Sequence, residues 1–143
     1  MRLEASAVEE IIRRGVKPLH AFVALMLAAL REFGVINFGV VHEVTKQAGE
    51  KMALIYGRGS SPSESLEKAA SLLEVGQFEV VPNQGNLLFM LKSNTCRVCP
   101  KGVGGLELPG KLCPLVGLLA GFSGMKAEEA RKEGSYCVIE FKA

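Results

Sequence analysis

Hydrophobic residues recur every three to four positions through the first half of the chain, which is the periodicity of amphipathic α-helices. The pattern predicts helices over residues 5–14, 18–33 and about 37–55. Gly15 and Gly34 end the first two helices, because glycine commonly follows the last helical residue. The first half of the chain is therefore expected to be helical.

The period changes after a fourth predicted helix. The sequence SPSE (61–64) is a capping box with proline at the first helical position, and the helix it opens ends by Gly76. FEVVP (78–82) and LLFML (87–91) then have the β-rich composition of strands, and NQG between them is a turn signal. We expect a β-hairpin here.

A further apolar run, LCPLVGLLAGFSG, predicts a helix, and SYCVIEF near the C-terminus predicts the last strand. The charged segment between them, which includes Glu128, Glu129 and Glu133, is expected on a solvated surface. Helices, hairpin, helix and strand in this order predict an α+β fold, with the N-terminal helices packed on a small, mainly antiparallel sheet.

The composition narrows the class of protein. The chain has 143 residues, of which 48% are hydrophobic, and this suits one folded domain with a substantial core. A net charge of +2 is too small to indicate a nucleic-acid partner. The apolar run Ala21–Leu30 is shorter than the roughly 20 residues of a bilayer span, so no membrane insertion is expected. Nothing resembles a secretory signal, which indicates the cytoplasm, where thiols stay reduced.

Three of the four cysteines lie in the stretch NTCRVCPKGVGGLELPGKLCP (94–114). Cys96-x-x-Cys99 places two thiols on one turn, Cys113 follows, and Cys137 lies in the last predicted strand. A CxxC pair and two single cysteines can supply the four thiolates of a tetrahedral zinc site. The residues alone also allow cysteines that pack or form disulfides, a redox-active dithiol, or an iron–sulfur cluster.

Glycines interrupt the helix that follows Cys113. Gly117 and Gly121 are four residues apart and share one helix face. They allow either close packing of the helix on the sheet or space for an apolar molecule between them. The other residues expected around such a groove are Leu118, Phe122, Phe89, Met90 and Tyr136, with Tyr136 as the polar anchor.

The segments HEVTKQAGEKM, CPLVGLLAGFSG and EGSYCVIEF, together with Cys96, resemble the vinyl-4-reductase domain, also called the predicted hydrocarbon-binding domain. The resemblance covers residues 34–143, which would form the core of a single domain (1–143), with residues 1–33 as an N-terminal helical extension. It implies an α+β fold similar to that of the vesicle-tethering TRAPP subunits. Related sensor domains bind zinc near a ligand pocket and are dimeric.

Residue by residue, the resemblance carries a zinc-ligand role to Cys113 and Cys137, and Cys96-x-x-Cys99 stands in place of the Glu-x-x-Cys of the sensors. It implies a non-catalytic, zinc-stabilised module that binds a hydrophobic small molecule as a sensor or carrier. A homodimer formed through one of the long helices, and a separate signalling partner protein, are also expected. The alternatives are a thiol redox protein or reductase subunit using the CxxC, and a TRAPP-like interaction scaffold.

Overall fold

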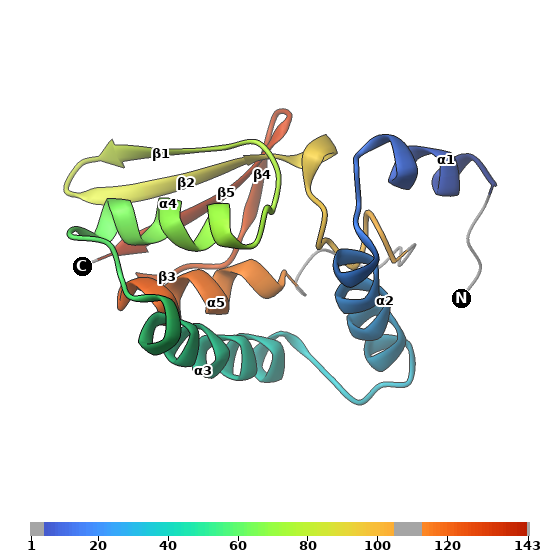
Figure 1. The fold of residues 1–143 in the computed structure, drawn as a ribbon, viewed down its shortest axis with the longest axis horizontal. Coiled ribbons are helices and arrows are strands. Elements are labelled where there is room, and N and C mark those ends of the chain that lie inside the picture. The colour runs from blue at the N-terminus through green and yellow to red at the C-terminus, as the bar shows by residue number, and fades with distance from the viewer. Residues whose placement is uncertain (1–4, 105–112, 143) are drawn as a thin grey trace.

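A computed structural model describes residues 5–104 and 113–142 of the chain (Figure 1). Its helices are α1 (Ala5–Arg13), α2 (Pro18–Glu32), α3 (Phe38–Tyr56), α4 (Pro62–Leu72) and α5 (Pro114–Ser123), with a 3₁₀ turn, η1, at Ser93–Thr95. Its strands are β1 (Phe78–Asn83), β2 (Asn86–Lys92), β3 (Lys126–Ala127), β4 (Arg131–Glu133) and β5 (Tyr136–Lys142). The α+β fold expected from the sequence is confirmed.

The sheet is antiparallel, with the strand order β1–β2–β5–β3, and β4 also pairs with β5. The hairpin of β1 and β2 turns at Gln84 and Gly85, whose φ angles are 50° and 84°. Two consecutive positive φ angles match the twist of a two-residue hairpin, and this is why the NQG signal is effective. The hairpin predicted from the sequence is therefore confirmed.

One edge of the sheet was missed by the sequence analysis. β3 and β4 are two short pieces that lie along the same side of β5, and the pairing register shifts by one residue between Ala127–Phe141 and Arg131–Val138. Such a shift marks a β-bulge, in which one strand holds an extra residue. The segment expected only to be a solvated charged surface is thus partly an edge strand.

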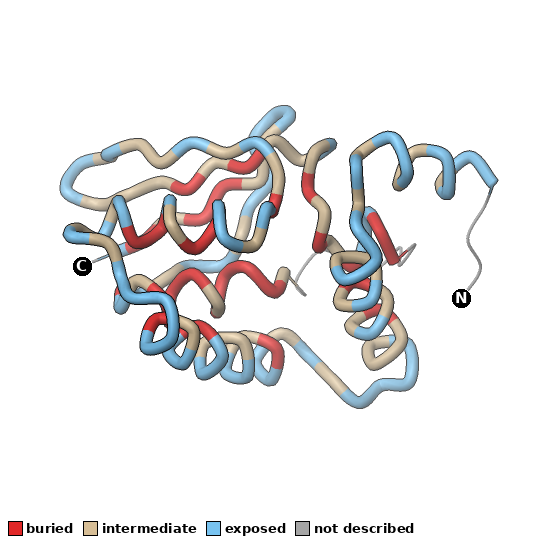
Figure 2. The backbone as a smooth tube through the Cα atoms, viewed as in Figure 1, coloured by how far each residue is buried: buried red, intermediate tan, exposed pale blue. Residues whose placement is uncertain are grey.

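Two helices, α4 and α5, pack against one face of the sheet, and α3 packs on α5 (Figure 1). Leu66 of α4 and Leu119 of α5 join Phe89 of β2 and Phe141 of β5 in the core. Figure 2 shows buried positions along α5 and the central strands, and eight of the ten α5 residues are buried. α5 is therefore the central helix of the fold, which explains its almost uniformly apolar sequence.

Glycines allow α3 and α5 to approach closely. A Cβ atom on Gly117 would lie 2.2 Å from Thr45 Oγ1, and one on Gly121 would lie 2.0 Å from the Lys46 carbonyl oxygen. Gly49 of α3 faces Leu118 of α5 in the same way, at 2.2 Å from its carbonyl oxygen. The two α5 glycines therefore serve helix–helix contact with α3, whereas the sequence analysis expected them to face the sheet.

The N-terminal helices stand beside this core. Lys17 forms an ion pair with Glu74 at 2.7 Å, and His20 Nε2 lies 2.8 Å from the Leu73 carbonyl oxygen, so the start of α2 is held at the end of α4. The same helix is close to Gly104, because a Cβ there would lie 2.6 Å from Ala28 Cβ. Among the helices described, none has both the length and the apolar character that a bilayer span requires.

Candidate functional site

All four cysteines line one pocket of about 760 Å³. Cys96 and Cys99 come from the loop after β2, Cys113 immediately precedes α5, and Cys137 lies on β5. Arg14, at the end of α1, also lines the pocket, so segments from both halves of the chain form its wall. The structure thus brings the four sequence-predicted cysteines to a common cavity.

The loop that carries Cys96 and Cys99 has a defined hydrogen-bonding pattern. Cys96 follows the η1 turn directly, and its N–H donates to the Ser93 carbonyl at 3.4 Å. Cys99 starts a turn in which its carbonyl accepts the Val103 N–H at 2.8 Å. The Gly102 N–H points to Cys99 Sγ at 3.3 Å. Backbone geometry therefore places a donor on the sulfur of Cys99.

Hydrogen bonding and charge favour the thiolate of Cys99. The Cys96 thiol donates to its sulfur, and with the Gly102 and Lys101 N–H groups and the positive charge of Arg14 this lowers the pKa of Cys99 to about 6. The same hydrogen bond, together with burial, raises the pKa of Cys96 well above its usual value. The environment of the pair therefore favours ionisation of Cys99 over ionisation of Cys96.

The other two cysteines are held as neutral thiols. Burial, as the largest effect, raises the pKa of Cys113 to about 12 and also raises the pKa of Cys137. For Cys137, the positive charge of Lys132 partly offsets this increase in pKa. Among the four, Cys99 is therefore the one thiol that the protein environment ionises.

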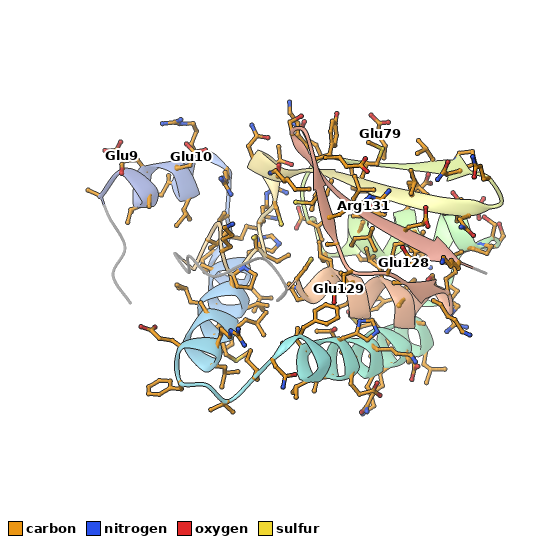
Figure 3. All side chains as sticks on the ribbon, turned by 180° about the vertical axis from the view of Figure 1, so that it is seen from behind. Glu9, Glu10, Glu79, Glu128, Glu129 and Arg131 are labelled. Atoms are coloured by element: carbon orange, nitrogen blue, oxygen red, sulfur yellow. The ribbon has the colours of Figure 1, made fainter. Side chains whose placement is uncertain are left out.

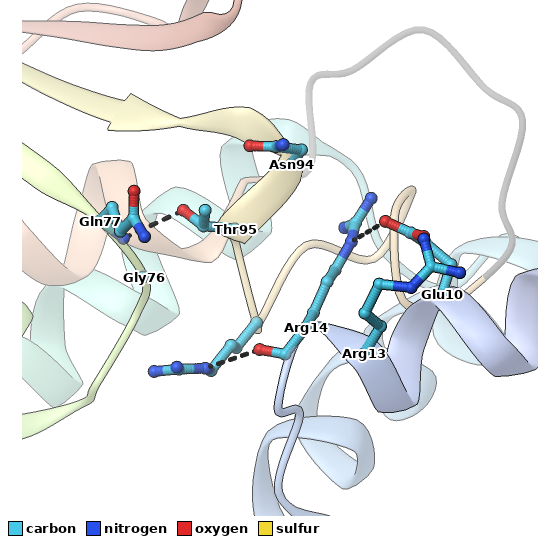
Figure 4. Close-up of a pocket in the computed structure, with 8 residues that line it drawn as sticks. Glu10, Arg13, Arg14, Gly76, Gln77, Asn94 and Thr95 are labelled. Atoms are coloured by element: carbon cyan, nitrogen blue, oxygen red, sulfur yellow. Dashed lines mark hydrogen bonds and ion pairs between the residues drawn. The ribbon is translucent and has the colours of Figure 1, made fainter.

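Arg97 holds the cysteine loop in place through three hydrogen bonds. Figure 4 shows the small cavity beside the loop, with Arg14 of one wall and Thr95 of the other. The Arg97 guanidinium donates to the Glu74 carbonyl at 2.9 Å and to the Arg14 carbonyl at 3.3 Å, while its backbone N–H donates to Val75 at 3.0 Å. These contacts lie at a second, smaller cavity of about 330 Å³ between α1 and the loop. Arg97 thus connects the loop to α1 and to the end of α4. It does not line the cysteine-lined pocket.

Positive charge gathers at the mouth of the cysteine-lined pocket. Arg14, Lys101, Arg131 and Lys132 line it. Arg14 and Arg131 are ion-paired with Glu10 and Glu133 at 3.6 Å and 2.7 Å, so the two lysines contribute the larger part of the positive charge. Arg131 lies on the bulged edge of the sheet, on the other side of the molecule from Glu9 and Glu10 of α1 (Figure 3). The pocket is therefore suited to an anionic group.

Comparison with models of protein families identifies the family of this chain. A family model described as the MJ0207 family matches residues 34–143. The chain belongs to the MJ0207 family. The matched region includes α3 to β5, and therefore every cysteine, while α1 and α2 precede it. No curated protein and no solved structure matches the chain.

Membership of the MJ0207 family corrects the resemblance drawn from the sequence. The segments around Cys96, Cys113 and Cys137 suggested a vinyl-4-reductase domain, but the matching family is a different one. The zinc ligands, dimeric sensors and aromatic ligands of vinyl-4-reductase relatives therefore cannot be carried over to this chain.

The metal-binding assignment is corrected too. In the part of the MJ0207-family chain that the structure describes, no group of three or more His, Cys, Asp or Glu side chains is arranged to hold a metal ion. The four cysteines line one cavity without forming such a group.

The residues expected to bind a ligand lie elsewhere in the fold. Gly117 and Gly121 meet α3, while Phe89 and Phe122 are fully buried in the core. Neither of the two cavities described above is lined by any residue of the expected set Gly117, Leu118, Gly121, Phe122, Phe89, Met90 and Tyr136. Arg14, Ala130 and Lys132 also line the cysteine-lined pocket but were not predicted. No local sequence pattern marks them, because only folding of the chain brings them close to the cysteines.

Proposed function

We propose that this protein is a small-molecule-binding module and that its ligand is an anionic molecule with an apolar body. The observation that carries the proposal is the cysteine-lined pocket. Its volume of about 760 Å³ falls in the usual range for small-molecule sites, and these combine apolar walls with a few polar groups. An interaction scaffold would instead have side chains filling this space.

The residues that line the pocket account for both the apolar body and the anionic group of the proposed ligand. Leu91, Val98 and Pro114 are buried apolar residues that form the inner wall. Lys101 and Lys132 are exposed at the mouth, where a bound anion keeps part of its hydration. An apolar body directed inward with the anionic group at the rim therefore satisfies both regions.

The cysteines bear on the location of the protein. The four form no disulfide in the structure, and the cytoplasm keeps thiols reduced. The proposal therefore includes the cytoplasm, which the sequence also indicated.

A fluorescence titration with two probes tests the proposal. Anilinonaphthalene sulfonate carries an anionic group on an apolar body, and phenylnaphthylamine is its uncharged counterpart. Lys101→Glu should weaken binding of the sulfonate roughly tenfold, because reversing a charge near a bound anion changes the energy by about 1–2 kcal/mol at a partly exposed site. Binding of the uncharged probe should change little.

Lys51→Glu is the matched control, because Lys51 is an exposed lysine of α3 outside the pocket and the change in net charge is identical. We expect this variant to bind both probes like the wild type. Equal weakening in the two variants, or no sulfonate binding by the wild type, would contradict the proposed function.

A further inference from the structure

We propose that Cys96 and Cys99 form a dithiol that reduces small anionic disulfides in the pocket, with Cys99 attacking and Cys96 resolving. This assignment rests on the proposed function, since the substrate occupies the same pocket as the ligand. It assigns a chemical reaction and a substrate class to the proposed binding site.

The positions of the two sulfurs assign the two roles. Cys99 is half-buried on the pocket wall, and its sulfur accepts the Gly102 N–H at 3.3 Å, a contact that favours the thiolate. Cys96 also lines the pocket, but only 6% of its surface is exposed, and it lies three residues before Cys99 on the same loop. An incoming disulfide therefore meets Cys99 first, and Cys96 waits within reach of the mixed disulfide.

The reaction is a two-electron thiol–disulfide exchange. The Cys99 thiolate attacks one sulfur of the substrate, the substrate S–S bond breaks, and the first thiolate product leaves and takes a proton from water. Cys96 then loses its proton to solvent and attacks Cys99 Sγ, which forms the Cys96–Cys99 disulfide and expels the second product thiolate. The protein dithiol is oxidised and one substrate disulfide is reduced to two thiols.

The charge of the pocket selects the substrate class. Arg14 and Lys101 lie beside Cys99, and Lys132 lines the same cavity, so carboxylate groups on the disulfide would be attracted to the reacting sulfur. These charges also stabilise the leaving thiolate. The second pair of cysteines does not compete as nucleophile, because burial raises the pKa of both Cys113 and Cys137.

The probe for the test is dithiobis(nitrobenzoate), an aromatic disulfide with two carboxylates whose thiol product absorbs visible light. In stopped-flow measurements at pH 7, the wild type should release two equivalents of product in its fast phase. A pKa near 6 instead of 9 raises the fraction of Cys99 that is thiolate at pH 7 but lowers the nucleophilicity of each thiolate. Together these two effects should make Cys99 react roughly fivefold faster than an ordinary thiol.

Two variants separate the roles of the sulfurs. Cys96→Ser should release one equivalent in the fast phase and keep the aromatic group attached to Cys99, which intact-mass measurement and peptide mapping detect. Cys99→Ser should lose the fast phase altogether. Lys51→Glu, which lies outside the pocket, should react like the wild type, and circular dichroism reports whether each variant is folded.

Several outcomes would overturn the dithiol. A fast phase that survives in Cys99→Ser, two fast equivalents from Cys96→Ser, or mapping that shows a disulfide other than Cys96–Cys99 after the reaction would each do so. Stoichiometric zinc in the purified protein would also overturn it, because metal-bound thiolates would not be a free dithiol.

If sulfonate binding depends on Lys101 but the thiols react slowly, only the dithiol fails. If the thiols react as expected without any sulfonate binding, only the binding proposal fails.

Discussion

The backbone N–H of Gly102 points to the sulfur of Cys99 at 3.3 Å, on the loop that leaves β2. The side-chain interaction with Cys96 and this N–H lower the pKa of Cys99, while the interaction with Cys99 and burial raise the pKa of Cys96. This relationship is the basis for treating the pair as a chemical site, in contrast to Cys113 and Cys137, which burial keeps protonated.

Alkylation of Cys99 by iodoacetamide should follow a titration curve with its midpoint near pH 6, because the thiolate is the reacting form. Cys96→Ala removes the strongest donor to the sulfur, so the midpoint should move upward. Mass spectrometry of peptides over a pH series measures this, and protein unfolded in guanidinium provides the reference curve near the ordinary pKa of 9. A folded-state midpoint at the unfolded value would contradict the described environment.

Gly121→Ala should destabilise the fold by about 3 kcal/mol, as overpacking of a close contact typically does. The added Cβ would lie 2.0 Å from the Lys46 carbonyl oxygen, so α3 and α5 must separate. Urea unfolding measures the change. Gly39→Ala is the control, because its Cβ would meet only the Asn37 side chain, at 3.3 Å. Equal stability of the two variants would show that the helices do not cross at Gly121.

Arg58→Met should cost about 1–2 kcal/mol, because two hydrogen bonds from the guanidinium are lost. Nε donates to the Phe122 carbonyl at 2.7 Å and Nη2 to the Gly121 carbonyl at 3.2 Å, so Arg58 satisfies the last turn of α5. Arg13→Met serves as the control in the same urea experiment. Its side chain is 73% exposed, and its ion pair with Glu10 should contribute under about 1 kcal/mol.

The apolar face of α2 should pair with a second copy of the chain. Leu19, Phe22 and Met26 are 73%, 61% and 43% exposed and lie on one side of the helix, and a net charge of +2 opposes self-association only weakly. Light scattering should give twice the chain mass at micromolar concentration. Phe22→Lys should give the monomer mass, whereas Leu72→Lys on α4 should remain dimeric. A wild-type monomer would rule out this interface.

Local sequence signals predicted most of the fold. The hairpin was predictable because its turn needs two residues with positive φ, and NQG supplies them at Gln84 and Gly85. α4 was predictable from the sequence SPSE, because Ser61 is its N-cap and accepts the Glu64 N–H. β3 and β4 were not, because all three residues of Arg131–Glu133 are exposed and show no alternation of apolar and polar residues.

The site was only partly predictable, since it depends on contacts between distant segments. The CxxC pattern correctly singled out Cys96 and Cys99, but nothing local showed that Arg14 would lie in the same pocket. The glycines of α5 correctly indicated a close contact of this helix, but the contact was predicted to be with the sheet and not with α3. Gly49 of α3, which forms the other half of that contact, has no signal of its own in a single sequence.

The most direct test of a ligand site at the cysteines is an NMR titration of the isotope-labelled 143-residue chain with anilinonaphthalene sulfonate. We expect saturable shift changes centred on the backbone amides of Cys99, Lys101 and Lys132, which line the cysteine-lined pocket. Shift changes confined to the exposed face of α2 around Phe22, or no saturable change at all, would contradict a ligand site at the cysteines.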